Sequence, residues 1–466
     1  MCYPNSYRVG MSNLGFHSLF HRTSSFHGVR IARFFIERDR SLFSPEQFIP
    51  EKRRLFHADS PTLRGFDVIL FTVSYELDYL NVIRMLELSS IPPVSEERDG
   101  RFPYVIAGGI APTANPMPLS VFSDIVFIGD MEQALERILE ILFRHGFKKS
   151  DTTLKGLSDV QGVYLPGGDV SKKSINNTIH VPAHSVVITL KTEFSGMFLV
   201  EIVRGCRGRC SFCMTRCVAK PVRVVQEDSV LDCVRAGAPH VKRAGLVAPL
   251  ITDHPRLIEI VKSINRMGIR VAFSSMRPDR FSVELAKLVR KNGQTTVTFA
   301  PETGSLPLRR RIGKDIGDDV LLEALDVAAR HGVKRVRYYI MYGLPEEGFD
   351  DVMSIVELAK KSVEVLRKNG GTLHLSINPF IPKRKTPLEN AKVYPLEYYR
   401  ENKRVLSRKL KEVRGVTYKF ESTRLLYLQY YLSVGGRETG SLLYGCYKAG
   451  SMKPFDELGP AYLPEV

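Results

Sequence analysis

An apolar strand that runs into three closely spaced cysteines constrains this chain more than any other feature of its sequence. Residues 198–203 read FLVEIV, and a short link leads to Cys206, Cys210 and Cys213, which have the spacing C-x3-C-x2-C. Three thiolates this close together can bind three irons of a 4Fe–4S cluster and leave the fourth iron open. A zinc site usually has paired C-x2-C knuckles and four ligands. Here a second knuckle is missing, and the nearby candidate for a fourth ligand is Cys217, a helical turn beyond Cys213. The alternatives to the cluster are a small structural metal site and unligated cysteines.

Strand-like and helix-like stretches alternate from the cysteine-bearing strand to about residue 382. Six such units predict a partial (β/α)6 barrel over residues 198–382, with its chemistry at the carboxyl ends of the strands. The expected strands after the first are 244–249, 270–274, 295–300, 335–341 and 373–378, and the expected helices between them are 255–267, 282–291, 317–331 and 350–368.

The first 147 residues also alternate, and they predict a separate α/β domain of Rossmann-like form. Two of its expected strands end in Gly108-Gly109 and Gly129-Asp130, where glycine would let the backbone approach a ligand closely. The expected strands are 67–74, 104–107 and 124–128, and the expected helices are 79–88 and 132–143.

Two further regions complete the predicted organisation. Residues 148–197 are expected to form a connecting segment with short strands at 162–165 and 185–190. Residues 383–466 are expected to form an α+β extension that is a candidate substrate-binding region, with a strand-like stretch at 416–420. Its tyrosines recur at helical spacings, which favours a place in the core; they are Tyr427, Tyr430, Tyr431, Tyr444 and Tyr447.

The formal net charge of +17 narrows the partners without identifying a substrate. Such a surplus favours RNA, an acidic protein or anionic cofactors, although the basic run between Glu401 and Phe420 can equally be a solvated helix face. The sequence lacks an apolar run of about 18 residues and a signal-peptide pattern, so we expect a cytoplasmic protein without a membrane partner. Seven cysteines fit a metal cofactor in a reducing compartment better than a disulfide framework.

The cysteine stretch, FLVEIVRGCRGRCSFCMTRC, resembles the signature of the radical S-adenosylmethionine (SAM) enzymes. In that family the open iron binds SAM, and the reduced cluster cleaves SAM to a 5′-deoxyadenosyl radical. Four segments of the first domain resemble the cobalamin-binding domain found ahead of many radical SAM cores: YPNSYRVGMSNLGFHSLFH, GFDVILFTVSYELDYLNV, VIAGGIAPTANP and IVFIGDMEQAL. The cobalamin signature D-x-H-x-x-G is absent, so the resemblance implies that no histidine of the chain binds the cobalt. The alternative is a Rossmann-like domain that binds nothing.

The resemblance also implies where the cofactors would bind. Cys206, Cys210 and Cys213 would hold the cluster, and an external one-electron reductant would be needed. No catalytic residue is assigned. SAM would lie beside residues at successive strand ends, namely Ser275, Arg277, Glu302, Tyr342, Gly343 and Glu346. Cobalamin would lie against the loops of the first domain, namely Ser12, Asn13, Leu14, Gly15, Ser74, Tyr75, Glu76, Gly108, Gly109, Gly129 and Asp130.

The activity that this resemblance implies is methyl transfer from methylcobalamin to an unactivated carbon, with a second SAM remethylating the cobalt. The expected substrate is a protein or peptide residue, as in a relative that modifies a glutamine α-carbon of methyl-coenzyme M reductase. RNA and a small metabolite are the alternative substrates. The competing activities are a ring-forming or rearranging oxidation, a methylthiotransferase acting on tRNA or a ribosomal protein, and a sensing protein. Methylthiotransferases carry three further N-terminal cysteines, whereas this chain has only Cys2 there.

Overall fold

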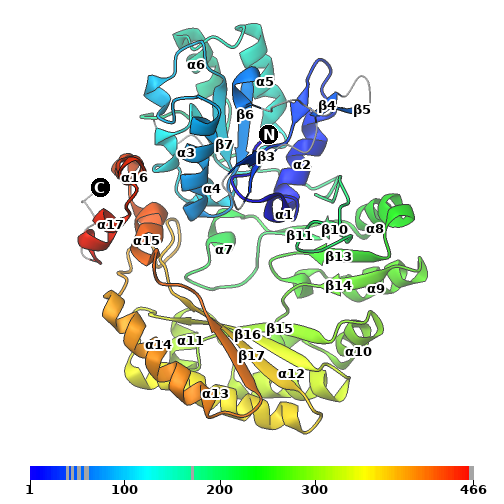
Figure 1. Cartoon of the computed structure of the whole chain (residues 1–466). Coiled ribbons are helices and arrows are strands. Elements are labelled where there is room, and N and C mark those ends of the chain that lie inside the picture. The colour runs from blue at the N-terminus through cyan, green and yellow to red at the C-terminus, as the bar shows by residue number, and fades with distance from the viewer. Residues whose placement is uncertain (38–40, 44–46, 50–53, 57–61, 169–172, 461–466) are drawn as a thin grey trace.

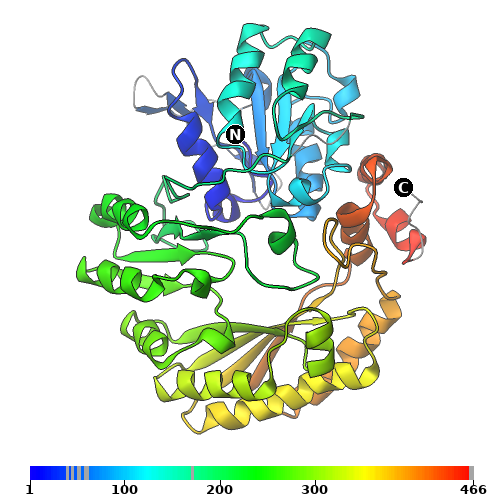
Figure 2. The same ribbon diagram turned by 180° about the vertical axis from the view of Figure 1, so that it is seen from behind.

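The computed structural model describes residues 1–460 except 38–40, 44–46, 50–53, 57–61 and 169–172. The chain forms an N-terminal sheet domain, a barrel-like middle part and a C-terminal part rich in helices (Figure 1). The view from behind shows the last helices reaching back to the sheet domain (Figure 2). No helix of the described residues is long and apolar enough to cross a membrane.

The sheet domain is built on parallel strands in the order β6-β7-β8, and β9 pairs antiparallel with β8 at the edge. Cys2 adds parallel bridges to Phe71 and Phe34, so the first strand of the chain is very short. The bounds are β6 (Val68–Thr72), β7 (Tyr104–Gly108), β8 (Ile125–Phe127) and β9 (Val163–Tyr164). Short antiparallel pairs precede them, formed by β1 (Ile31–Ala32), β2 (Phe35–Ile36), β3 (Leu42–Phe43), β4 (Gln47–Ile49) and β5 (Arg54–Phe56).

The central strands of this domain are apolar along their whole length because both faces of the sheet are covered. Ile69 and Phe71 belong to one apolar cluster with helix α3, whereas Leu70 and Ile106 belong to a second cluster with α2, α5 and α6. The helices are α1 (Tyr7–Gly10), α2 (Leu14–Thr23), α3 (Tyr79–Leu88), α4 (Ile110–Ala114), α5 (Ala134–Arg144) and α6 (Asp151–Ser158).

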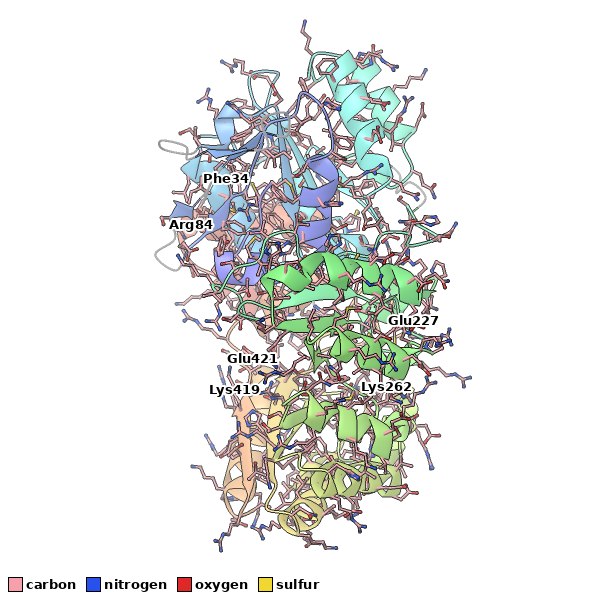
Figure 3. The ribbon with its side chains drawn as sticks, turned by 90° about the vertical axis from the view of Figure 1, so that its right-hand side faces the viewer. Phe34, Arg84, Glu227, Lys262, Lys419 and Glu421 are labelled. Atoms are coloured by element: carbon pink, nitrogen blue, oxygen red, sulfur yellow. The ribbon has the colours of Figure 1, made fainter. Side chains whose placement is uncertain are left out.

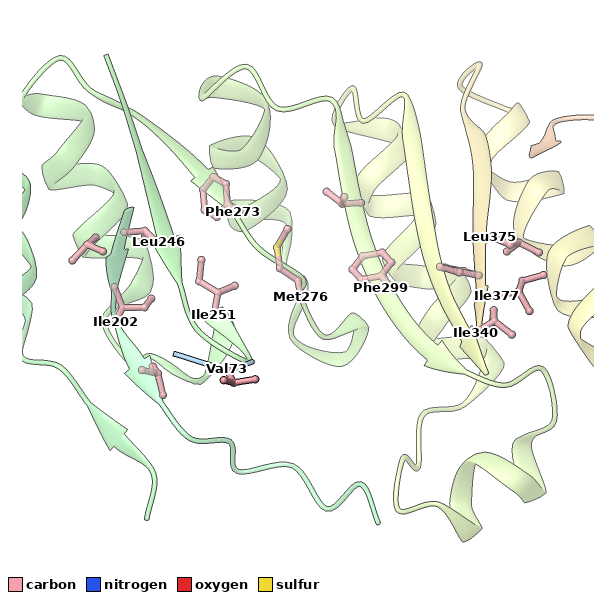
Figure 4. Packing of buried hydrophobic residues seen from close by; sticks show 14 of the residues in the cluster. Val73, Ile202, Leu246, Ile251, Phe273, Met276, Phe299, Ile340, Leu375 and Ile377 are labelled. Atoms are coloured by element: carbon pink, nitrogen blue, oxygen red, sulfur yellow. The ribbon is translucent and has the colours of Figure 1, made fainter. Parts of the chain in front are cut away.

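The barrel-like part consists of a three-stranded parallel sheet, β10-β13-β14, followed by a four-stranded parallel sheet, β15-β16-β17-β18. The two sheets meet where the backbone N–H of Met276 donates to the carbonyl of Thr298 at 3.1 Å. Figure 4 shows the strands side by side, with their buried apolar residues. The bounds are β10 (Phe198–Glu201), β13 (Arg243–Val247), β14 (Arg270–Phe273), β15 (Thr296–Glu302), β16 (Arg335–Tyr342), β17 (Thr372–Pro379) and β18 (Val416–Phe420).

Amphipathic helices cover the outer face of these sheets. In α9 the buried residues Leu257, Ile260, Val261 and Ile264 recur every three or four positions, which gives one apolar stripe. The expected strands and helices of this part are all present within a few residues, and β18 extends the sheet beyond the six expected strands. The helices are α8 (Glu227–Gly237), α9 (Leu257–Arg266), α10 (Val283–Lys291), α11 (Leu306–Arg311), α12 (Asp318–Arg330) and α13 (Phe349–Arg367).

The C-terminal part packs its tyrosines as the helical spacing predicts. Tyr427, Tyr430 and Tyr431 are buried, and Tyr444 and Tyr447 pack against the same cluster while partly exposed. The basic region is helix α14, which buries only a narrow stripe and otherwise faces solvent. The helices are α14 (Leu396–Lys411), α15 (Leu426–Val434), α16 (Arg437–Ala449) and α17 (Lys453–Leu458).

One expected strand is wrong. Residues 185–190 form no strand, because only the adjoining His184 makes an antiparallel bridge, to Val200. Ser185 still donates its backbone N–H to the carbonyl of Leu199 at 2.9 Å, and the chain then leaves the edge of the sheet. The expected strand at 162–165 is present as β9.

Candidate functional site at the barrel mouth

The three predicted cluster cysteines lie in one loop between β11 (Val203–Arg204) and α7 (Met214–Val218). All three thiols are partly buried and none is in a disulfide. Burial raises the pKa of Cys206 and of Cys210, and the charge of Cys213 raises both further, so the three sulfurs interact with one another.

The donor chemistry of this loop fits a 4Fe–4S cluster. The backbone N–H of Gly208 donates to the Sγ of Cys206 at 3.2 Å, and hydrogen bonds of this kind tune the sulfurs of iron–sulfur clusters. Cys217 lies on α7, and its Sγ is 4.0 Å from a guanidinium nitrogen of Arg216. In the described part of the chain, no three His, Cys, Asp or Glu side chains are placed so that together they could hold a single metal ion.

A turn that follows α11 lies directly against the cysteine loop. The backbone N–H of Ser211 donates to the carbonyl of Ile312 at 2.9 Å. Gly313 has a φ of +74°, and a Cβ there would collide with the carbonyl oxygen of Arg209. Only glycine therefore fits at this point of contact.

Charged side chains from the ends of β14 and β15, and from the turn after α11, lie near the cysteines. Glu302 at the end of β15 is buried and forms an ion pair with Lys314 at 2.7 Å. Lys314 lowers the pKa of Cys206 and of Cys210, against the upward effect of burial. Arg277, after β14, pairs with Asp279 at 2.8 Å, and the charge of Cys210 contributes to the raised pKa of Arg277.

The structure brings some of the predicted SAM residues to this mouth and places others elsewhere. Ser275 is partly exposed next to Arg277, while Tyr342 is fully buried and packs edge-on against the rings of Tyr399 and Phe420. Gly343 has a φ of +81° and approaches Tyr399 so closely that a Cβ would overlap its ring.

Glu346 does not point into the site, and its neighbour Glu347 takes the buried position. The side chain of Glu346 is 76% exposed and pairs with Arg311 at 3.0 Å. The carboxylate of Glu347 accepts from the backbone N–H of Gly343 and from the hydroxyl of Tyr398, the latter at 2.7 Å. Nothing in the run LPEE distinguishes the two glutamates before the backbone turn is known.

Asp253 is a buried carboxylate that the sequence analysis missed. It accepts a hydrogen bond from the backbone N–H of Arg207, inside the cysteine loop, at 3.3 Å, and its charge contributes to the raised pKa of Cys206. Its position after β13 is the available signal, because carboxyl ends of parallel strands meet at one edge.

The strand-end loops of the sheet domain line a cavity of about 240 Å³, which is also lined by Glu201 and Arg204 before the cysteine loop and by Val218 and Ala219 after it. Gly109 and Gly129 have positive φ, and a Cβ at either would collide with a backbone carbonyl, of Val73 and of Ser174 respectively. The predicted cobalamin residues that line this cavity are Leu14, Gly15, Gly108, Gly109, Gly129 and Asp130.

The remaining predicted cobalamin residues serve other contacts. Asn13 caps α2 by accepting from the N–H of Phe16, and it donates to the hydroxyl of Ser74 at 3.0 Å. The hydroxyl of Ser12 accepts from the backbone N–H of Glu193 at 2.9 Å. Tyr75 lies in a second cavity, and the buried Glu76 pairs with Lys383 at 2.7 Å.

The second cavity has a volume of about 640 Å³ and is lined in part by the end of the cysteine loop. Cys213 and Met214 line it from the loop, Asn378 and Pro379 from the end of β17, and Tyr75 from the sheet domain. Exposed residues at its rim, Glu421, Ser422 and Arg424, connect it to the surface.

A buried ionic network joins the sheet domain to the strand that carries the cysteines. Arg204 pairs with Glu201 at 2.8 Å, with Glu132 at 3.0 Å and with Asp130 at 3.1 Å. Asp130 also pairs with Arg223 of β12 (Arg223–Val224). Burial would raise the pKa of Asp130, but the two arginines hold it below its ordinary value.

His17 is the histidine that projects from α2 into the sheet domain, and both of its ring nitrogens are engaged. Its Nε2 lies 3.0 Å from the carbonyl of Met11, and its Nδ1 accepts from the N–H of Val186 at 3.1 Å. Burial lowers its pKa to about 4, so the ring is neutral. It acts as a structural residue of the core rather than as a free ligand.

The structure therefore combines parallel sheets, a loop with three partly buried cysteines and a separate α/β sheet domain. The sequence matches two family models, radical SAM proteins, N-terminal, over residues 15–166, and the radical SAM superfamily over residues 200–359. The chain belongs to the radical SAM superfamily.

Among curated proteins, the chain is 28% identical over 396 residues to an uncharacterized protein of Methanocaldococcus jannaschii, covering 83% of this chain and 78% of that protein. It is 25% identical over 278 residues to an uncharacterized methyltransferase of Pyrococcus horikoshii, covering 55% of this chain and 58% of that protein.

Two solved structures have a similar fold. The radical SAM methyltransferase TsrM of Kitasatospora setae, with tryptophan and a SAM analogue bound, aligns with a TM-score of 0.51 and 12% identity, over 83% of this chain and 74% of its own. The cobalamin-dependent SAM radical enzyme OxsB, with aqua-cobalamin bound, aligns with a TM-score of 0.50 and 16% identity, over 74% of this chain and 53% of its own.

Proposed function

We propose that this chain is a cobalamin-dependent radical SAM methyltransferase that methylates an unactivated carbon of a protein or peptide residue in the cytoplasm. One observation carries the proposal. Helix α7 begins directly after Cys213 and reaches both cavities: Met214 lines the larger one, and Val218 lines the one at the edge of the sheet domain. A corrinoid held by the sheet domain and a substrate in the larger cavity would therefore meet beside the cysteine loop.

The groups that the proposal requires are a 4Fe–4S cluster with SAM, which supplies a 5′-deoxyadenosyl radical, and cobalamin, which supplies the methyl group. Cys206, Cys210 and Cys213 would hold the cluster. Glu302 and Arg277 would meet the charged ends of SAM, because both lie at strand ends close to Cys210. Gly109 and Gly129 line the cavity at the edge of the sheet domain, against which the corrinoid would lie.

The choice of a protein or peptide substrate is supported by the surface connection of the larger cavity. Its rim of exposed Glu421, Ser422 and Arg424 admits one side chain of a long molecule while the rest stays outside. A glutamine of methyl-coenzyme M reductase is one candidate of this kind. An external one-electron reductant is the second partner of the proposal.

The proposal is tested by what one turnover consumes. Anaerobic protein reconstituted with iron, sulfide and hydroxocobalamin is incubated with a reductant, methyl-deuterated SAM and a peptide that contains the candidate glutamine. We expect near-equal amounts of 5′-deoxyadenosine, S-adenosylhomocysteine and peptide carrying the deuterated methyl group. The variant Cys210→Ala, treated in parallel, should form no 5′-deoxyadenosine.

Product that forms with 5′-deoxyadenosine but without S-adenosylhomocysteine would show that the enzyme does not transfer methyl groups. A ring-forming or rearranging oxidation would then be the better interpretation.

A further inference from the structure

The inward face of β16, β17 and β18 is polar, which is unusual for the inside of a barrel. Closed barrels fill their interior with layers of apolar side chains. Along β16, Val336, Tyr338 and Ile340 are buried, and Tyr338 bonds to Ser362 of α13, so this set faces the helices. The alternate residues of β16 must therefore point inward.

The inward residues of neighbouring strands stand side by side in two rows. In the first row Arg337 pairs in register with His374, and His374 with Thr417. In the second row Tyr339 pairs with Ser376, and Ser376 with Lys419. We call these six residues the inner polar face.

The inner polar face leads into the larger cavity. The next row along the same strands is Met341 and Asn378, which are paired in register and line that cavity. Glu421 follows β18 at the same level, and its N–H donates to the carbonyl of Ile377 at 2.9 Å. Figure 3 shows Lys419 and Glu421 one above the other, below the sheet domain.

Positive charge is concentrated on this face, and none of its six residues is acidic. Within the part of the chain that the structure describes, Arg335, Arg337 and Lys419 form no ion pair. The Nε of Arg337 is buried and lacks a hydrogen-bond partner there. Burial lowers the pKa of His374, and the charges of Arg337, Arg335 and Lys419 lower it further, so these cations converge on one spot.

From this arrangement we infer that the inner polar face binds an acidic segment of the substrate protein and guides the adjoining residue into the larger cavity. The inference rests on the proposed function and names the charge of its substrate. Aspartate and glutamate carboxylates would meet the unpaired Arg337 and Lys419, which satisfies the orphaned guanidinium nitrogen. The hydroxyl of Ser376, between them, can bond to the peptide backbone.

An acidic peptide suits this face better than RNA does. Single-stranded nucleic acid is usually held by successive aromatic side chains on which bases stack. The inner polar face has one partly exposed aromatic residue, Tyr339, which is 37% exposed. Its other members are two cations, two hydroxyls and one imidazole, which can bond to carboxylates and peptide groups.

The test measures binding of a fluorescein-labelled octaglutamate peptide to the full chain by fluorescence anisotropy, with an octaglutamine peptide as the uncharged probe. We expect the wild type to bind octaglutamate and not octaglutamine. The double variant R337Q/K419Q should weaken binding at least about tenfold, because each lost charged hydrogen bond is costly. The control R404Q/R408Q removes two exposed charges from the outer helix α14 and should bind like the wild type.

Equal weakening in the double variant and in the control would mean that binding follows net charge alone, and the inference would be wrong. It would also be wrong if wild type failed to bind octaglutamate, or if an octauridylate RNA displaced the peptide and depended on the same two residues.

The proposed function fails separately from this inference. Peptide binding that depends on Arg337 and Lys419, in a protein that makes no S-adenosylhomocysteine, would support acidic-segment binding by the inner polar face and refute methyl transfer. Methyl transfer that proceeds equally well in R337Q/K419Q, on a peptide rich in acidic residues, would refute the role of the inner polar face alone.

Discussion

At the scale of single residues, the three thiols of the cysteine loop and the nearby Cys217 make a matched comparison. Replacing Cys206, Cys210 or Cys213 with alanine should abolish cluster binding, because each supplies one thiolate that no neighbouring group replaces. Cys217→Ala should keep it, since Cys217 lies a helical turn beyond the loop on α7. Iron and acid-labile sulfide are measured after anaerobic reconstitution. A cluster retained by Cys210→Ala and lost by Cys217→Ala would reverse the assignment.

For single residues, the sequence predicted where functional segments lie better than it predicted the direction in which each side chain points. The cysteine loop and the strand-end glycines could be located because their spacing and backbone demands appear in the residue order. Glu346 and Glu347 could not be told apart, because a positive φ of 60° at Glu346 decides which carboxylate turns outward. Ser12 and Asn13 belong to a predicted ligand loop, yet their side chains are used to cap and join local segments.

At the scale of elements, the pH dependence of stability should reveal the buried carboxylate behind β16. Burial raises the pKa of Glu347 to about 7, against hydrogen bonds from Gly343 and Tyr398 that lower it. The folded state thus binds this proton more tightly than the unfolded state, whose carboxyl has a pKa near 4.5. The destabilisation caused by ionised Glu347 in the folded protein is absent below about pH 4.5, grows as the pH rises and is complete above about pH 7.

Glu347→Gln should remove this cost. The unfolding free energy of the variant minus that of wild type should therefore increase by about 2–3 kcal/mol from pH 5 to pH 8. Urea unfolding at both pH values measures the change. Glu357→Gln, which alters an exposed pair with Lys360 on α13, serves as the control and should follow wild type. Parallel pH profiles for all three proteins would contradict the raised pKa.

Elements were predictable where packing and periodicity agreed. Helix α3 begins and ends at the expected residues, Tyr79 and Leu88, because its apolar stripe is complete between polar ends. The segment 185–190 has the residues of a strand but does not pair with a strand along its length. Amino-acid composition does not show which segments pair with one another. β18 was visible as a strand-like stretch, but its parallel place beside β17 depends on the tertiary fold.

At the scale of the whole molecule, the alternation of strands and helices predicted two parallel-sheet regions. The contacts that join the two regions could not be predicted from the sequence. These contacts are long-range and depend on side chains far apart in sequence. Lys383 reaches Glu76 at 2.7 Å, and Lys385 donates to the carbonyl of Thr113 at 2.6 Å. One apolar cluster likewise runs from α3 through the barrel-like part to α15 and α16. The two regions are therefore expected to unfold together.

The last prediction tests the ionic part of this connection. Asp130→Ala removes the carboxylate that pairs with Arg223, whose side chain is 4% exposed. Arg204 keeps Glu201 and Glu132, so the cost comes mainly from the buried Arg223, which among the described residues is left with the carbonyls of Asn176 and Ala219. Leaving a buried charge without its partner costs about 3–5 kcal/mol.

The chain has no tryptophan, so urea unfolding is followed by circular dichroism and tyrosine fluorescence. The control Asp232→Ala breaks an exposed pair with Arg235 and should change stability by less than about 1 kcal/mol. If both variants unfold at the same urea concentration as wild type, the network does not hold the sheet domain to the barrel-like part.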